Sequence, residues 1–489
     1  MIPLSSIAEF AKVRPSAIAV EDRDRALTWA EFEEETRRIL PALDAALPAD
    51  RARVMMDVEA SAEVFVVAAA LATLGVPWVA LDPSKPAEVR HAQMDVLASD
   101  GVVRVVDGNL TLTDLSWREP LPLGRAVPKA VDGQPQRREF QALGFTSGTT
   151  GMPKMVLRTS PSEARRNAYL IDRFRFSPED RFLLCLPLSH ASGHGWARTY
   201  LTAGATVVIV NDDLSAISDA ILNRGITGSL LVPPVLAGVV AKIRMARGEQ
   251  EADTRMRFLL TGGRHLSRSL IGEAFATLGP VLHAYYGTTE TGVNAIAEPF
   301  DLLADMRSSG RPLPGCSIVI LDHNSVPVAA GTPGRIAIAS YMNAHTYHSG
   351  PIPGVQIAGE LYLLTVDTGF LAPDGRLVVL GRIAEALSAE DFGDLVGLED
   401  DAKLLCGIHD VAVTASAGSG SGIDDVGPHI KVFVTRERTK SLDDALVQYL
   451  ITKLARQCGV RVPVLVSFVP QLQFNTTGKF DMLSTLQSA

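Results

Sequence analysis

A loop rich in glycine and hydroxyl residues runs from Gly144 to Lys154 and ends in Pro-x-Lys. Glycines let a backbone approach an anion closely and adopt positive φ, while backbone N–H groups and hydroxyls point at the anion as donors. Lys154 adds a positive charge, and Pro153 stiffens the exit of the loop. We therefore expect a loop that wraps a polyphosphate; the alternative is a surface turn of small polar residues. The residues expected to contact the phosphates are Thr146, Ser147, Gly148, Thr149, Thr150, Gly151 and Lys154.

The spacing of this loop differs from that of the nucleotide kinases. Their P-loop reads Gly-x-x-x-x-Gly-Lys-Ser/Thr, whereas here Lys154 follows Gly151 by three positions and precedes Met155. The apolar residues before the loop are consistent with a short strand that leads into it. The sequence therefore argues against a nucleotide kinase fold.

The composition limits the partners of the chain. Its 489 residues suffice for more than one domain, because single cores stop growing near about 250–300 residues. The net charge of −9 argues against nucleic acid or an anionic membrane as the main partner, so phosphate must be bound by a local site. The 4 cysteines lack Cys-x-x-Cys spacing, and residues 1–10 lack the pattern of a signal peptide. We expect a cytoplasmic protein without a membrane segment; the oligomeric state is left open.

The hydrophobic pattern predicts an α/β fold. Before Ser309, apolar strand-like runs alternate with helical stretches, which is typical of layered α/β subdomains with largely parallel sheets. Val64–Leu74 is the most continuous apolar run of the first hundred residues and is too short to cross a bilayer, so we expect a buried helix. Thr28 is expected to cap another helix, with Glu31 at the third position.

After Ser309 the pattern changes to shorter strands between Gly/Pro turns, which indicates a small β-rich subdomain. The expected strands are 316–321, 334–339, 361–365 and 377–380. Asp374-Gly375 is a hairpin turn by its chemistry. Beyond Gly381-Arg382 strand and helix patterns resume over about a hundred residues, enough for a small mobile α+β domain. We therefore predict an N-terminal domain of residues 1–381 and a C-terminal domain of residues 382–489.

Three further motifs combine residues suited to a nucleotide. Residues 285–292, Tyr-Tyr-Gly-Thr-Thr-Glu-Thr-Gly, offer a ring for adenine, hydroxyls for phosphate and the Glu290 carboxylate for Mg²⁺, which prefers hard oxygen ligands. In Thr-Val-Asp-Thr-Gly-Phe at 365–370, the Asp367 carboxylate can accept from both hydroxyls of a ribose. Near the end of the chain, Asn-Thr-Thr-Gly-Lys places Lys479 in a loop. Two of these motifs have an alternative interpretation when they are taken singly. Residues 285–292 could form a turn with an exposed Glu290, and Lys479 could be a solvated surface lysine.

The order of these motifs is more specific than any one of them. A Thr/Ser/Gly loop with Pro-x-Lys, then Tyr-Gly-x-Thr-Glu, Thr-x-Asp-x-Gly, Gly-Arg and a near-terminal Gly-Lys resembles the adenylate-forming superfamily. That superfamily includes acyl-CoA and aryl-CoA synthetases, peptide synthetase adenylation domains, luciferases and ATP-dependent amide synthetases. The resemblance implies a ligase that uses ATP and Mg²⁺. A carboxylate attacks the α-phosphate, pyrophosphate leaves, and a nucleophile then displaces AMP from the acyl-adenylate.

The resemblance also implies how the nucleotide is bound. The loop from Thr146 to Lys154 would hold the β- and γ-phosphates, and Tyr286 would lie against adenine. Asp367 would bind the ribose, with Arg382 nearby at the domain junction. The nucleotide-binding candidates outside the loop are Tyr286, Gly287, Thr288, Asp367 and Arg382.

The catalytic candidates follow from the same resemblance. Thr289 would contact the α-phosphate and Glu290 would help to bind Mg²⁺. Lys479 would bridge the carboxylate and α-phosphate oxygens and stabilise negative charge as the adenylate forms. His190, in Pro-Leu-Ser-His, matches a segment where a histidine borders the acyl channel in acyl-CoA synthetases; a structural histidine is the alternative, as it is for His194.

The acid pocket is expected to accept an acid without an α-amino group. Amino-acid-activating relatives place an aspartate in this region to pair with the substrate ammonium, and residues 189–196 contain none. An aryl or short cyclic acid fits this expectation. The pocket candidates are His190, Gly195, Trp196, Val232, Gly262, Gly263 and Tyr285.

The chain departs from the family pattern most strongly after Arg382. Three departures are smaller. Met155 and Val366 each stand where the family has a glycine, and Gly334-Arg335 stands where the family has Gly-Glu. After Arg382 the family shows an acidic hinge residue followed by Lys and Gly in a loop used for thioester formation. Here an ungapped alignment places Ala384, Ser388 and Asp391 at those positions.

This altered segment also carries the carboxylates of Glu385, Glu390 and Asp391. Such a surface repels the phosphates of CoA and suits an amine nucleophile, which predicts amide formation. Drift or misalignment in a variable loop is the alternative explanation, with CoA thiol as the rival acceptor. A hypothesis from another class is a catalytically inactive nucleotide-binding regulatory protein.

Overall fold

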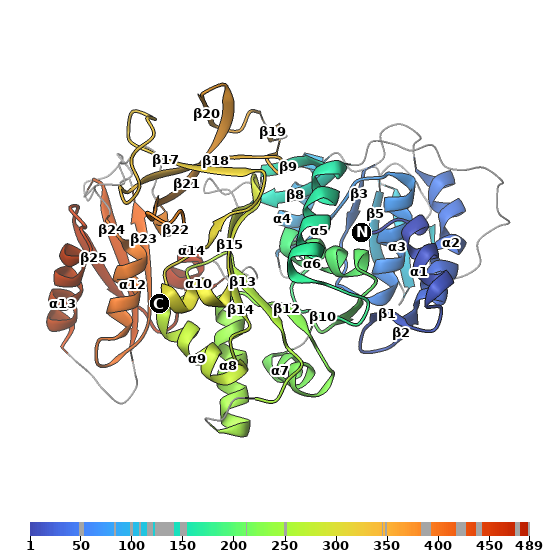
Figure 1. Cartoon of the computed structure of the whole chain (residues 1–489), viewed down its shortest axis with the longest axis horizontal. Helices are drawn as coiled ribbons and strands as arrows, with labels where there is room; N and C mark the ends of the chain where they lie inside the picture. The colour runs from blue at the N-terminus through green and yellow to red at the C-terminus, as the bar shows by residue number, and fades with distance from the viewer. Residues whose placement is uncertain are drawn as a thin grey trace.

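The computed structural model describes most of the chain, and its elements carry the labels of Figure 1. The described residues are 1–47, 53–82, 85–97, 101–106, 109–114, 121–122, 141–146, 154–211, 213–248, 252–344, 346–347, 350–382, 393–416, 427–436, 443–474 and 480–487.

The largest sheet within these residues has nine strands in the order β16-β15-β14-β13-β12-β10-β11-β1-β2. Strands from β14 through β1 pair in parallel, and β15, β16 and β2 pair antiparallel at the two edges. The strands are β1 (Ile18–Glu21), β2 (Ala26–Thr28), β10 (Arg181–Leu184), β11 (Thr206–Ile209), β12 (Gly228–Leu230), β13 (Phe258–Gly262), β14 (Leu282–Thr288), β15 (Gly292–Ala297) and β16 (Arg311–Pro312). The expected layered α/β unit is present, although its edges are antiparallel.

Both faces of this sheet are buried. Successive strand residues point to opposite faces, so Phe182 joins the cluster of α6 while Leu183 joins that of α7 and α8. Because helices cover both faces of the sheet, side chains on both sides of each strand are buried, and the strands are almost continuously apolar. The helices next to this sheet are α5 (Ser160–Phe174), α6 (Ala191–Thr202), α7 (Leu214–Asn223), α8 (Pro233–Arg247), α9 (Arg268–Leu278) and α10 (Pro299–Ala304).

A second sheet near the N-terminus has the order β4-β3-β5-β6-β7. The expected helix at Val64–Leu74 is confirmed as α3, almost wholly buried, and Thr28 forms the expected capping box with Glu31 at the start of α2. The elements of this region are α1 (Leu4–Val13), α2 (Trp29–Ala46), β3 (Val54–Met56), α3 (Ala62–Leu74), β4 (Trp78–Ala80), α4 (Ala87–Leu97), β5 (Gly101–Val106), β6 (Asn109–Asp114) and β7 (Leu121–Pro122).

The β-rich subdomain is present, and one of its strands is longer than the sequence predicted. Its order is β17-β18-β21-β20, with β22 also paired to β21. The pattern predicted a strand at 361–365, whereas β21 continues through Asp367 because β18 and β22 both pair with it. The strands are β17 (Cys316–Leu321), β18 (Gly334–Ser340), β20 (Gly354–Ile357), β21 (Glu360–Leu371) and β22 (Leu377–Arg382).

A small three-stranded sheet joins two distant parts of the chain, in the order β19-β9-β8. Strands β8 (Gln141–Thr146) and β9 (Lys154–Thr159) form an antiparallel hairpin. Strand β19 (Thr346–Tyr347) adds to the other edge of β9. The loop that connects β8 to β9 is the glycine-rich segment of the sequence analysis.

The C-terminal domain packs beside the end of the central sheet that carries α9 (Figure 1). Its own core lies between the sheet β23-β24-β25 and the helices α12 and α13. The elements are α12 (Leu395–Lys403), β23 (Ile408–Ser416), β24 (His429–Arg436), α13 (Asp444–Gln457), β25 (Val464–Phe468) and α14 (Met482–Gln487). The predicted fold class, a large N-terminal α/β domain with a smaller C-terminal domain, is confirmed; the boundary at residue 382 stays a prediction. None of the described helices has the length and apolar character needed to cross a membrane.

Candidate active site

The glycine-rich segment connects the two strands of a hairpin. Thr146 ends β8 and lies opposite Lys154, the first residue of β9. The strand that was expected to lead into the loop is therefore present. Ser147, Gly148, Thr149, Thr150 and Gly151 lie outside the described residues. The hairpin fixes the two ends of the loop at adjacent positions of one sheet.

Glu290 lies close to the strand that leaves this loop. The hydroxyl of Tyr347 donates to Glu290 Oε1 at 2.9 Å, and the backbone N–H of Ala344 donates to the Glu290 carbonyl at 2.7 Å. Tyr347 belongs to β19 and is paired with Val156 of β9. Two motifs that are far apart in the sequence are thus joined by one tyrosine. The sequence analysis did not identify Tyr347, because a strand of two residues has no periodicity.

The turn that carries Thr289 and Glu290 is built by the hairpin of β14 and β15. Gly287 is required there, since a Cβ at this position would lie 2.0 Å from the carbonyl oxygen of Gly292. The Thr288 and Thr291 hydroxyls lie 3.0 Å apart, and the Thr291 N–H donates to the Thr288 hydroxyl at 3.2 Å. These contacts hold the turn in one shape.

Asp367 is a buried carboxylate engaged by two other candidates. The Tyr286 hydroxyl donates to Asp367 Oδ2 at 2.8 Å, and Arg382 Nε donates to Asp367 Oδ1 at 3.1 Å. Only 6% of Asp367 is exposed, and the backbone N–H of Asp367 donates to the Thr365 hydroxyl at 3.1 Å. Each carboxylate oxygen has a second lone pair, so the group retains acceptor capacity for a ligand.

The pKa of Tyr286 fits its role as a donor. Burial raises the pKa of the phenol well above its ordinary value, and the negative charge of Asp367 raises it further. The phenol therefore stays protonated at neutral pH and donates to the carboxylate. The contact joins β14 to β21, which lie in different sheets, and it orients the ring of Tyr286 beside the carboxylate expected to bind ribose.

The residues present fit a magnesium ion bound together with phosphates. No group of three or more His, Cys, Asp or Glu side chains suited to a metal occurs among the described residues. Mg²⁺ in nucleotide sites is commonly bound by one or two carboxylates plus waters and substrate phosphates. Glu290 supplies one such carboxylate, with Oε1 already oriented by Tyr347.

Tyr285 and the two glycines at the end of β13 form one wall of the expected acid pocket. The Tyr285 ring lies directly over Gly262, where a Cβ would be 2.4 Å from the ring. Gly263 has a φ of 81°, which favours glycine. The Tyr285 hydroxyl lies 3.1 Å from the hydroxyl of Ser192, in the first turn of α6. Ser192 is a residue that the sequence analysis missed.

His190 and Gly193 shape the start of α6. His190 precedes the helix as its N-cap, and its backbone N–H donates to the Pro187 carbonyl at 3.0 Å. A Cβ at Gly193 would lie 2.5 Å from that same carbonyl oxygen, so the helix can pack against the turn only with glycine there. The predicted Pro-Leu-Ser-His segment is therefore a tight turn that leads into α6.

The remaining pocket candidates lie deeper in the protein. Trp196 is 1% exposed, with its ring 5.5 Å from that of Phe258, so it packs in the core. Val232 is also buried in that cluster. The Gly195 carbonyl accepts from Arg166 Nη2 at 3.0 Å. The described structure thus brings Gly262, Gly263, Tyr285 and Ser192 together, and Trp196 belongs to the buried cluster against which Tyr285 packs.

His194 has a structural role. Its Nδ1 donates to the Leu188 carbonyl at 3.0 Å, and its ring lies 5.4 Å from that of Trp78. Burial lowers the pKa of His194 to about 3, and the positive charge of Arg198 lowers it as well. The imidazole is neutral at physiological pH and fixes the turn before α6.

Lys479 lies outside the described residues, but both of its flanks are described. Phe474 and Phe480 form an antiparallel bridge, and their rings lie 6.1 Å apart. The bridge brings the two ends of segment 475–479 together.

Comparison with known proteins identifies the family. The family model described as AMP-binding enzyme matches residues 7–348, which is more than half of the chain. The chain belongs to the AMP-binding enzyme family. The expected membership of the adenylate-forming superfamily is thereby confirmed, and the protein is an AMP-forming acid ligase.

Relatives within the AMP-binding enzymes differ in the acceptor they use. An indoleacetate–CoA ligase of Aromatoleum aromaticum is 29% identical over 361 residues, which cover 73% of this chain and 68% of that protein. The amide bond synthetase McbA of Marinactinospora thermotolerans has the same fold, with a TM-score of 0.77 at 21% identity over 99% of both chains. ATP-bound MatB of Rhodopseudomonas palustris aligns with a TM-score of 0.78 at 20% identity over 99% of both chains.

Proposed function

We propose that the protein activates a carboxylic acid without an α-amino group as an acyl-adenylate and transfers the acyl group to an amine. In the first step a carboxylate oxygen bonds to the α-phosphorus of ATP, and the bond to pyrophosphate breaks. In the second step the amine nitrogen bonds to the acyl carbon, AMP leaves, and the amine loses a proton. The products are an amide, AMP and pyrophosphate.

The observation that carries the first step is the buried Asp367 carboxylate between Tyr286 and Arg382. A carboxylate held this way is preorganised to accept from the ribose hydroxyls, so it needs no reorientation when ATP binds. Glu290, joined to β9 through Tyr347, takes the magnesium role, which neutralises phosphate charge. Thr289, next to it in the turn, contacts the α-phosphate in this proposal.

The phosphate and lysine roles complete the proposal for the first step. The loop from Thr146 to Lys154 holds the departing pyrophosphate. Lys479 stabilises the negative charge that builds up on the carboxylate and α-phosphate oxygens. His190 borders the acyl channel beside the Tyr285 wall.

Two features support the class of acid. The segment 189–196 has no aspartate that would pair with an α-ammonium group. The Tyr285 wall is formed by an aromatic ring over two glycines, with the Ser192 and Tyr285 hydroxyls bonded to each other at 3.1 Å. An apolar wall with one hydroxyl pair suits an aryl or cyclic acid.

The sequence after Arg382 supports an amine as the acceptor. Segment 383–392, which contains Glu385, Glu390 and Asp391, lies outside the described residues. Its acidic side chains would repel the phosphates of CoA and attract a protonated amine, which becomes the nucleophile after it loses a proton. The relationship to an indoleacetate–CoA ligase favours the rival acceptor, the thiol of CoA.

One experiment separates these acceptors. The enzyme is incubated with ATP, Mg²⁺ and a panel of aryl, cyclic and aliphatic acids, with either simple amines or CoA, and the products are weighed by mass spectrometry. We expect amides and little acyl-CoA. Efficient acyl-CoA formation without amide would contradict the amine acceptor and favour the CoA ligase.

Acid-dependent exchange of labelled pyrophosphate into ATP tests the first step by itself. We expect exchange with at least one acid in the panel, and we expect Lys479→Ala to abolish it with an unchanged circular dichroism spectrum. ATP binding without exchange for any acid would instead support the inactive nucleotide-binding protein. Undiminished exchange in Lys479→Ala would refute the role given to Lys479.

A further inference from the structure

Arg264 crosses from the acid-pocket wall to the C-terminal domain. It directly follows Gly262-Gly263, the glycines beneath Tyr285. Its guanidinium carbon lies 4.0 Å from the centre of the Phe474 ring, and Nη2 lies 3.6 Å from Glu399 Oε1. The side chains of Arg264 and Glu399 are only 14% and 10% exposed. A cation over an aromatic face is attracted more strongly where water is excluded.

The ring that Arg264 contacts is one end of a defined structural unit. Phe474 forms a bridge with Phe480, and the Phe480 ring packs 5.1 Å from that of Phe433 in β24. In the sequence, Phe480 directly follows Lys479. A displacement of Phe474 therefore displaces the residue next to Lys479, because the two phenylalanines face each other in the bridge and the Asp481 N–H beside it donates to the Gln473 carbonyl at 2.8 Å.

Glu399 fixes the other side of the guanidinium. Its Oε2 accepts from the backbone N–H of Val413 at 3.2 Å, and Oε1 lies 3.4 Å from Lys403 Nζ. Glu399 is thus held by its own domain before it meets Arg264. A fixed carboxylate and a fixed ring define one position for the guanidinium, which suits a planar cation better than a flexible one.

We propose that Arg264 is a positioning residue for acyl-adenylate formation, which holds Phe474 and the C-terminal domain in register with the acid-pocket wall. The proposal rests on the function proposed above, because it assigns the step in which Lys479 acts. Arg264 touches neither the acid nor ATP in this proposal. It acts through Phe474, and it links the wall that contacts the acid to the chain that carries the catalytic lysine.

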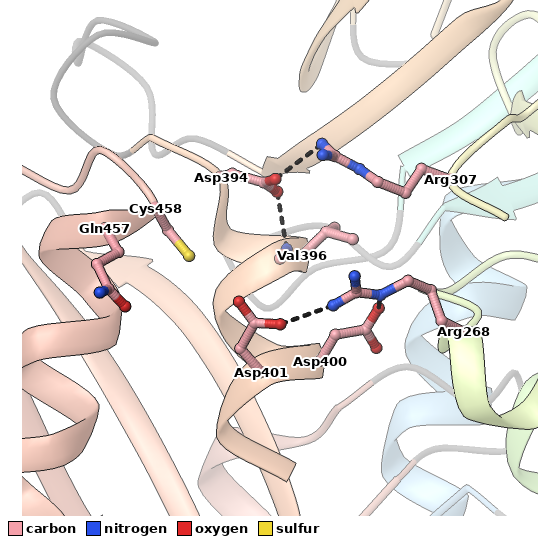
Figure 2. A pocket seen from close by; sticks show the side chains of 9 residues that line it. Arg268, Arg307, Asp394, Val396, Asp400, Asp401, Gln457 and Cys458 are labelled. Atoms are coloured by element: carbon pink, nitrogen blue, oxygen red, sulfur yellow. Dashed lines mark hydrogen bonds and ion pairs between the residues drawn. The ribbon is translucent and has the colours of Figure 1, made fainter. Parts of the chain in front are cut away.

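The same junction contains other ion pairs that serve as comparators. Arg307 donates to Asp394 at 2.8 Å, and Arg268 donates to Asp401 at 2.6 Å, both beside a cavity of about 240 Å³ (Figure 2). The Arg307 pair meets the start of α12, whereas Arg264 meets Phe474. Arg307→Gln therefore removes an interdomain cation without removing a contact to Phe474.

The test separates the two half-reactions in Arg264→Met, Arg264→Lys and Arg307→Gln. Arg264→Met keeps an apolar stem but loses the charge. We expect its rate of adenylate formation in a single turnover to fall between about 10-fold and 100-fold, the loss typical of a small misplacement, with unchanged KM for ATP and acid. Arg264→Lys should restore only part of the rate, because an ammonium also binds an aromatic face but lacks the planar shape that the fixed ring and carboxylate favour. Arg307→Gln should stay within about twofold of the wild type.

The second half-reaction supplies the internal control. Wild type and Arg264→Met receive preformed acyl-adenylate and the acceptor, and we expect similar transfer rates. A double variant, Arg264→Met with Phe474→Leu, should lose no more than the worse single variant, because both remove one interaction. Wild-type adenylation by Arg264→Met, or equal losses in both half-reactions without rescue by Arg264→Lys, would overturn the proposal.

Hydrogen–deuterium exchange tests the contact without any reaction. We expect peptides that end at Phe474 or begin at Phe480 to exchange faster in Arg264→Met than in wild type and in Arg307→Gln. Unchanged exchange would refute the positioning contact. This result is independent of the proposed function, which fails instead if the wild type binds ATP but forms no adenylate with any acid.

Discussion

At the scale of single residues, the structure explains why Asp367 can be both buried and charged. A carboxylate with 6% exposure needs partners for its negative charge, and the Tyr286 hydroxyl and Arg382 supply one for each oxygen. Both residues were identified from their motifs, but the hydrogen bond between them was not predicted, because they are 81 positions apart and meet only when two sheets pack. Ser192 was missed for a related reason: a serine at a helix start has no signal until Tyr285 is placed against it.

Tyr286→Phe tests this arrangement. Removing one donor from a buried carboxylate should cost about 2 kcal/mol of unfolding free energy, measured by urea denaturation. If Asp367 binds ribose, the KM for ATP should rise by about tenfold in the same variant, because the carboxylate is less well oriented. Tyr362→Phe is the matched control, since it removes a tyrosine hydroxyl that contacts Ser317 Oγ at 2.9 Å and Glu360 Oε2 at 3.5 Å, neither of which is a nucleotide-binding candidate. A change in KM for ATP in both variants, or in neither, would argue against the ribose role.

At the scale of elements, the sequence predicted those helices and strands that depend on residues close to one another along the chain. The capping box at Thr28 and the apolar run of α3 need only neighbours along the chain, and both were predicted. Strand β21 was predicted to end at 365 because Asp-Thr-Gly at 367–369 interrupts its apolar pattern, yet two neighbouring strands pair with it and it continues to Leu371. Strand β19 has only two residues and exists because β9 pairs with it.

Gly262→Ala tests the acid-pocket wall. Gly262 is paired in register with Tyr285, and a Cβ would lie 2.4 Å from the ring, so the ring must tilt and lose its contact with Ser192. We expect a loss of about 1–3 kcal/mol in stability and a raised KM for the acid with an unchanged KM for ATP. Gly272→Ala in α9 is the control, since nothing lies within 4 Å of a Cβ there, and it should stabilise by about 0.5–1 kcal/mol. Equal KM values for the acid in wild type and Gly262→Ala would refute the wall.

At the scale of the whole molecule, the sequence from Glu385 to Asp401 is one acidic run, and the structure shows what the end of this run contacts. Glu399, Asp400 and Asp401 meet cations of the N-terminal domain, so they join the domains. Sequence reasoning could not separate them from Glu385 and its neighbours, because the partners are more than a hundred residues away. Only the earlier part of the run remains as a candidate for selecting the acceptor.

Asp400→Asn tests the docking of the domains. Burial pushes the pKa of Asp400 up, but the hydrogen bond and charge of His265 and the charge of Arg268 outweigh it and hold the pKa below its ordinary value. Such a group contributes stability that is fully present above the unfolded pKa of about 4 and is lost as pH falls through the lower folded value.

We expect the wild type to exceed Asp400→Asn by about 1.5–3 kcal/mol in unfolding free energy at pH 7, because the variant removes a buried charged acceptor that bonds with His265 and Arg268. This difference should stay constant down to about pH 5 and shrink towards pH 3. Urea denaturation at several pH values measures it. A difference that grows as pH falls would show that the Asp400 carboxylate is not stabilised in its charged form by its cationic partners.

The register of β21 and β22 places Arg382, the last residue of β22, opposite Asp367. The end of β22, where the predicted domain boundary lies, is therefore held at the carboxylate proposed to bind the nucleotide. Binding of a ribose at Asp367 would thus act directly on the last residue of β22, where the chain leaves the β-rich subdomain.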